Sequence, residues 1–138
     1  MVALAVPQFG QRPVVCGARP LLFKAHASLE RGRVVEAACQ LREAMRLYLA
    51  AEMQFHSVTL KKSRDMTPAT MSKALRRAKV MGPGVCEWCL EIIDYCNKVV
   101  HCQFVRRGLI AASIEITFEL LDGSPYLIDA ATATGGGR

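Results

Sequence analysis

The residues best suited to chemistry are concentrated in residues 85–105, whose sequence is VCEWCLEIIDYCNKVVHCQFV. This segment holds four cysteines and a histidine: Cys86, Cys89, Cys96, Cys102 and His101. Zinc prefers thiolate and imidazole ligands, but three or four of them must converge on one point. The apolar spacing predicts one continuous helix, on which Cys96 and His101 point about 140° apart. A zinc site is therefore the less favoured interpretation, and we expect no metal or cofactor.

The pair Cys86-x-x-Cys89 also suggests a thiol function. It lies near the expected start of the helix, where the helix dipole stabilises a thiolate. Thioredoxin-like motifs of this spacing follow a strand in a βαβ unit, and the sequence offers no such unit. We interpret Cys86 as a residue flanking the core. Three cysteines, each within an apolar helical pattern, are expected to pack as small hydrophobic residues: Cys39, Cys89 and Cys96.

Two further features carry a resemblance to a known family. Leu29–Leu49 (LERGRVVEAACQLREAMRLYL) predicts a helix end, a glycine turn and a long helix, and the later helix contains Asn97-x-x-x-His101. Together they resemble a HEPN domain, a helical family that includes metal-independent ribonucleases. The resemblance spans about residues 21–121. It implies a helical bundle, site residues Asn97 and His101, and a homodimer with the motif at the subunit interface.

The family motif begins with an arginine, and Cys96 occupies that position here. In active members the arginine is taken to hold the phosphate while the histidine assists proton transfer. A cysteine offers no guanidinium fork to phosphate oxygens. Histidine is a residue type suited to acid–base catalysis near neutral pH, but without a cation near His101 we expect little cleavage. Arg106 and Arg107 follow closely, although they do not fit the motif.

Positive charge is concentrated in another stretch of the chain. Residues 61–79 contain seven basic side chains and one acidic side chain, an excess of six that equals the net charge of the whole chain, +6. Such a patch favours anionic partners, nucleic acid before membrane, although a solvated helix face is the alternative interpretation. The residues that we expect to contact nucleic acid are Lys73, Arg76, Arg77, Lys79, Arg106 and Arg107.

Apolar spacing predicts an all-α fold of four to five helices, with residues 21–122 as the bundle. The clearest helix is 33–58, in which apolar residues recur at three- and four-residue steps. The other predicted helices are 20–32, a basic helix that opens with Thr67 as N-cap and Pro68 in the first turn, 85–105, and 109–121. Residues 1–20 predict an irregular N-terminal arm, and residues 123–138 predict a flexible C-terminal tail.

The last helix, 109–121, also alternates apolar and polar residues as a strand does. We favour a helix because no partner strand is evident in the sequence. As a helix it has two apolar edges, and the monomer core needs only one. The second edge favours self-association, or docking of a protein partner by a non-catalytic interaction module.

Cellular location follows from apolar runs and cysteine use. No run reaches the roughly 18–20 apolar residues of a membrane span, and no secretory signal is recognisable. We therefore expect a cytoplasmic protein with reduced cysteines and no membrane contact. The favoured function is RNA or nucleotide binding, or membership of a toxin–antitoxin or defence pair, with degenerate catalysis. A non-catalytic interaction module and, less favoured, a zinc or thiol protein are the alternatives.

Overall fold

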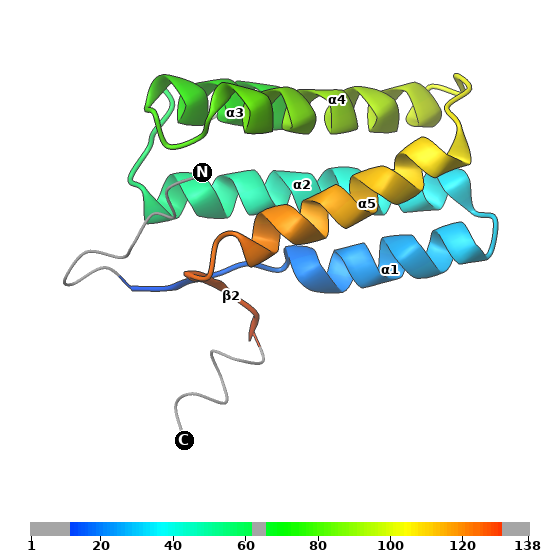
Figure 1. The fold of residues 1–138 in the computed structure, drawn as a ribbon, viewed down its shortest axis with the longest axis horizontal. Helices are drawn as coiled ribbons and strands as arrows, with labels where there is room; N and C mark the ends of the chain where they lie inside the picture. The colour runs from blue at the N-terminus through cyan, green and yellow to red at the C-terminus, as the bar shows by residue number, and fades with distance from the viewer. Residues whose placement is uncertain (1–11, 62–65, 131–138) are drawn as a thin grey trace.

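The computed structural model describes residues 12–61 and 66–130. Within these ranges the chain forms five α-helices and two short strands, in the order β1 Val14–Val15, α1 Ala18–Glu30, α2 Val34–Phe55, α3 Pro68–Arg77, α4 Pro83–Val100, α5 Arg107–Asp122 and β2 Leu127–Ile128. In Figure 1, α2 runs through the middle, with α1 on one side and α3 and α4 on the other, and α5 crosses obliquely. The predicted all-α bundle is confirmed.

Helix α2 lies in the middle of the bundle because apolar residues cover a broad face of it. Leu41, Met45 and Leu49 are fully buried, and smaller alanines beside them let neighbouring helices approach closely. The helix ends three residues earlier than the sequence predicts. Ser57 adopts a left-handed φ of 55°, and the Val58 amide then donates to the Met53 carbonyl, which terminates the helix.

The helix predicted at 85–105 corresponds to α4, Pro83–Val100. The predicted helix begins two residues too late and ends five residues too late. Pro83 begins α4, a position where the missing N–H costs no hydrogen bond. Cys102 ends it with a left-handed φ of 61°, and the Gln103 amide donates to the Lys98 carbonyl at 2.8 Å. This is a helix-terminating pattern that glycine usually supplies.

A glycine at this position is therefore expected to stabilise the fold. A residue with a side chain pays about 1–2 kcal/mol to adopt the left-handed conformation, whereas glycine pays about 0.5–1 kcal/mol in backbone entropy. Cys102 is exposed, so Cys102→Gly removes no packing. We expect the free energy of unfolding, measured by urea denaturation, to rise by about 0.5–1 kcal/mol. A decrease would show that the thiol makes a stabilising contact.

The helix in the last predicted segment is confirmed, and α5 spans Arg107–Asp122. Its buried face includes two hydroxyl residues, and each hydroxyl donates to a carbonyl four residues earlier at 2.7 Å, Ser113 to Leu109 and Thr117 to Ser113. These hydrogen bonds satisfy polar groups that would otherwise be costly in the core. The alternation of polar and apolar residues is therefore compatible with a buried helix face.

The predicted arm and tail boundaries require correction. β1 pairs in parallel with β2, so the segment predicted as a flexible tail contributes a strand, and neither strand pairs with residues 109–121. The Val14 amide donates to the Tyr126 carbonyl, and the Cys16 amide donates to the Ile128 carbonyl, both at 2.9 Å. The first helix begins at Ala18, inside the predicted arm. The rest of the arm and tail, residues 1–11 and 131–138, lies outside the described residues.

A buried polar cluster fastens the segment after α5 to the end of α2. The Tyr126 ring stacks on Phe55 with ring centres 3.7 Å apart, and its hydroxyl donates to Glu52 Oε2 at 2.9 Å. His56 Nε2 lies 3.0 Å from the same hydroxyl. Because this hydroxyl has a single proton, which goes to Glu52, the imidazole is the donor to Tyr126. Burial of Glu52 raises the pKa of its carboxyl group.

This raised pKa makes stability depend on pH with a definite sign. Burial is the largest influence on the Glu52 carboxyl; the hydrogen bonds and His56 act in the opposite sense. The neutral form of the Glu52 carboxyl group is favoured in the folded state. Its contribution to the free energy of unfolding is therefore complete below the ordinary pKa of 4.5, and it is lost as pH rises through the folded-state pKa. The wild type's free energy of unfolding, measured by urea denaturation, should therefore fall relative to that of Glu52→Gln as pH rises above 4.5. An increase would contradict the sign.

The cysteines are partly placed as predicted. Cys89 and Cys96 are buried, but Cys39 is exposed and Cys86 lies in the core rather than beside it. Cys39 lies one turn after Val35 and Glu36 on α2, and both of these residues are exposed too, although its apolar neighbours suggested burial. No helix within residues 12–61 or 66–130 is both long and apolar enough to cross a membrane.

Candidate functional site

The basic helix α3 presents most of the residues that the sequence assigns to nucleic-acid binding. Thr67 caps it as predicted, by accepting a hydrogen bond from the Thr70 amide, and Pro68 occupies the first turn. Met71 and Leu75 are fully buried on one side. The basic residues on the other side and just beyond the helix are all exposed: Lys73, Arg76, Arg77 and Lys79. The helix therefore has one apolar face and one strongly basic face.

The charges on this face are not neutralised within the described ranges. Other basic residues pair with acids, such as Arg19 with Asp122 at 2.8 Å and Lys98 with Asp94 at 3.0 Å. No ion pair within residues 12–61 and 66–130 includes a basic residue of α3 or the nearby Lys61. The basic face therefore keeps a positive potential that attracts anions.

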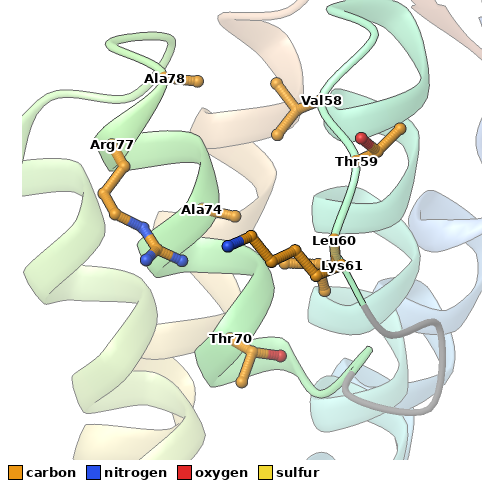
Figure 2. Close-up of a pocket in the computed structure, with 8 residues that line it drawn as sticks. All are labelled: Val58, Thr59, Leu60, Lys61, Thr70, Ala74, Arg77 and Ala78. Atoms are coloured by element: carbon orange, nitrogen blue, oxygen red, sulfur yellow. The ribbon is translucent and has the colours of Figure 1, made fainter.

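A pocket of about 650 Å³ lies between α3 and the segment that follows α2. Figure 2 shows Arg77, from α3, and Lys61, from residues 58–61, extending from opposite sides into the same space. The other lining residues are Val58, Thr59, Leu60, Thr70, Ala74 and Ala78. Residues 58–61 follow the left-handed turn at Ser57, and Figure 2 shows them running alongside α3, where they line one side of the pocket.

The HEPN-like motif lies at the last turn of α4. Asn97 Oδ1 accepts a hydrogen bond from Arg42 Nη1 at 3.0 Å, and Arg42 comes from α2. Arg42 was not predicted as a site residue, because no local motif connects it with a residue 55 positions away. Burial raises the pKa of Cys96 to about 12, so this residue is an uncharged thiol at neutral pH.

His101 caps the end of α4 and is exposed to solvent. Its imidazole has no hydrogen-bond partner among the described residues, and a general base needs such a partner to orient it. Arg106 and Arg107 are exposed, in the connection after α4 and at the start of α5. Among residues 12–61 and 66–130, Arg42 makes the one side-chain hydrogen bond to a predicted catalytic residue.

The predicted site residues fall into two groups that the fold separates. The basic end of α3 adjoins the start of α4, whereas Asn97 and His101 lie at its other end, about 27 Å away for an 18-residue helix. In Figure 1 the connection after α4, in yellow, lies at the opposite end of the bundle from the end of α3. These two groups of residues cannot act on one phosphate, although an extended strand of nucleic acid can contact both.

The cysteine pair at the start of α4 is poorly arranged for zinc or thiol chemistry. Cys86 Sγ donates to the Ser72 carbonyl at 3.7 Å, and burial raises the pKa of Cys89 to about 12. Both thiols are buried within the continuous helix from Pro83 to Val100. Within the described residues no group of three or more histidine, cysteine or acidic side chains is placed to hold a metal ion.

No family model, curated protein or solved structure matches the chain.

Proposed function

We propose that this protein binds RNA through its phosphate backbone, using the basic surface formed by α3 and residues 58–61. One observation carries the proposal. Five exposed cationic residues gather there without an ion pair among the described residues: Lys61, Lys73, Arg76, Arg77 and Lys79. The resemblance to HEPN domains supports RNA as the nucleic acid and a role in a toxin–antitoxin or defence pair.

The physical basis of this binding is the release of counterions. A strand of RNA holds cations near its phosphates, and protein cations that replace them free those ions into solution. Each phosphate neutralised contributes a salt-dependent term to the affinity. Such contacts carry no base specificity, so we expect the protein to bind many sequences with similar affinity.

Cleavage is not part of this proposal. His101 lacks an orienting hydrogen bond among the described residues, and the arginine nearest the motif, Arg42, already donates to Asn97. Stabilisation of a developing phosphorane charge requires donors that are free to point at the phosphate. We expect no RNA cleavage above background, and His101→Ala should bind RNA as the wild type does.

The test is fluorescence anisotropy with a mixed pool of labelled single-stranded RNA across a salt series. If five phosphates are neutralised, the logarithm of the association constant should fall against the logarithm of salt concentration with a slope of about −3.5. His101→Ala is measured beside the wild type for both binding and cleavage. Absence of binding at low salt would refute the proposal, and cleavage lost in His101→Ala would restore a catalytic role.

We also propose a homodimer that pairs through the outer edge of α5. Leu109 is 40% exposed there, and Ile116 and Leu120 are only partly buried. Leu109→Arg places a charge on this edge without disturbing the core. Sedimentation velocity should show a dimer for the wild type and a monomer for the variant. A wild type that is monomeric at about 100 μM would contradict the proposal, because the dissociation constant of a stable dimer lies well below that concentration.

A further inference from the structure

We infer that the pocket between residues 58–61 and α3 binds the terminal phosphate of a nucleotide, and that Lys61 and Arg77 hold it. This inference rests on the proposed function where the nucleotide is the end of an RNA strand. The same chemistry belongs to a free nucleoside monophosphate. The two sources share a phosphate monoester attached to a sugar, which is the group recognised.

The arrangement of charge is the first argument. Lys61 and Arg77 come from segments that run side by side, and their side chains extend into one space (Figure 2). Neither residue has an ion pair among the described residues. Two like charges directed at the same volume repel each other, and an anion between them adds two attractive interactions that outweigh this repulsion. The guanidinium offers a planar fork to two phosphate oxygens, and the ammonium adds a compact charge.

The number of charges favours a terminal phosphate over an internal one. A phosphate monoester carries about −1.5 to −2 charges at neutral pH, whereas an internal diester carries one. Two cations therefore match a monoester. The remaining basic residues of α3 lie outside the pocket lining, where they are free to contact the diesters that follow along the strand.

The size and lining of the pocket are the second argument. A volume of about 650 Å³ lies within the range of about 300–1,000 Å³ that is typical of small-ligand sites. Val58, Leu60 and Ala74 supply apolar surface, and Thr59 is a further lining residue. This combination suits a ligand that joins a charged phosphate to a base whose flat faces can pack on apolar side chains, such as a phosphorylated nucleoside.

The experiment compares three RNA strands of one sequence, each with an internal fluorophore that leaves both ends unmodified. One strand carries a 5′-phosphate, one carries a 3′-phosphate, and one has hydroxyl groups at both ends. Because charge-assisted hydrogen bonds are the strong class, we expect at least one phosphorylated strand to bind about tenfold more tightly than the hydroxyl strand. Titration of the unlabelled protein with adenosine monophosphate, followed by NMR, tests the free nucleotide.

Neighbouring arginines provide a matched control. Arg77→Gln and Lys61→Gln should each reduce the preference for the phosphorylated strand to about one, because each removes a pocket cation. Arg76→Gln removes an equally exposed charge outside the pocket lining, so it should weaken binding of all strands and preserve the preference. Ala78→Leu narrows the pocket without changing charge and should also lower the preference. Thermal unfolding of each variant checks that the fold is retained.

The outcomes separate this inference from the proposed function. Salt-dependent binding with no preference for either phosphorylated strand overturns the terminal-phosphate site and leaves the RNA-binding proposal intact. Adenosine monophosphate binding that requires Arg77, without binding of any strand, supports the pocket and refutes RNA binding. A preference that survives both Arg77→Gln and Ala78→Leu overturns the assignment to this pocket. Absence of binding by every ligand overturns both proposals.

Discussion

Replacing Tyr126 by alanine is expected to lower the free energy of unfolding by about 3–5 kcal/mol, the usual cost of removing a buried aromatic ring. The ring is 5% exposed and stacks on Phe55, so its loss leaves a cavity at the end of α2. The same change exposes Glu52 and releases β2 from its place beside β1. Urea denaturation followed by circular dichroism measures the difference.

Tyr126→Phe is the matched control because it keeps the ring and removes only the hydroxyl group. Glu52 then loses its hydrogen-bond donor and His56 loses its acceptor, at a cost of about 1–3 kcal/mol. The expected order of stability is wild type, then Tyr126→Phe, then Tyr126→Ala. Equal stability of wild type and Tyr126→Ala would show that the segment after α5 is not part of the cooperative core.

Replacing the three basic residues of α3 and Lys79, which follows the helix, by glutamine is expected to weaken RNA binding about a thousandfold at low salt. If each of Lys73, Arg76, Arg77 and Lys79 neutralises one phosphate, the four together contribute about 2.8 to the slope of the logarithm of affinity against the logarithm of salt concentration. Extrapolated from about 1 M to about 50 mM salt, this slope amounts to about three to four orders of magnitude in affinity. The variant should also show a correspondingly shallower salt dependence by fluorescence anisotropy.

Two double variants test whether the location of the charge matters. Arg76→Gln with Arg77→Gln removes two charges from the basic surface, and Arg106→Gln with Arg107→Gln removes two exposed arginines from the opposite end of α4. The pairs match in residue type and change of net charge. We expect a loss of about ten- to a hundredfold for the first pair and a much smaller loss for the second. Equal losses would indicate attraction by net charge alone.

The sequence predicts those parts of the fold that depend on local patterns. Apolar periodicity locates α2 and α5, and Thr67 with Pro68 marks the start of α3, because each signal lies within a few residues of its effect. The helix ends were less accurate. Ser57 and Cys102 adopt left-handed conformations that their residue types do not announce, since glycine is the usual signal. The two-residue strands are too short to produce any alternation.

The candidate sites show the same division between local and distant information. The basic character of α3 was evident from the sequence, but the pocket was not, because Lys61 and Arg77 line it from two separate segments. Likewise, Arg42 and Asn97 belong to helices whose packing brings them together. Such pairings depend on tertiary contacts, and a single sequence contains no local pattern for them.

The pairing of β1 with β2 has a consequence for the order of folding. These strands come from opposite ends of the described chain, so their pairing closes a very long loop and carries a large entropic cost. Contacts of this kind form late, after local helices and their nearest neighbours have assembled. The strands should therefore also open first in the native state. In hydrogen exchange, the Val14 and Cys16 amides should exchange faster than the amides in the middle of α2.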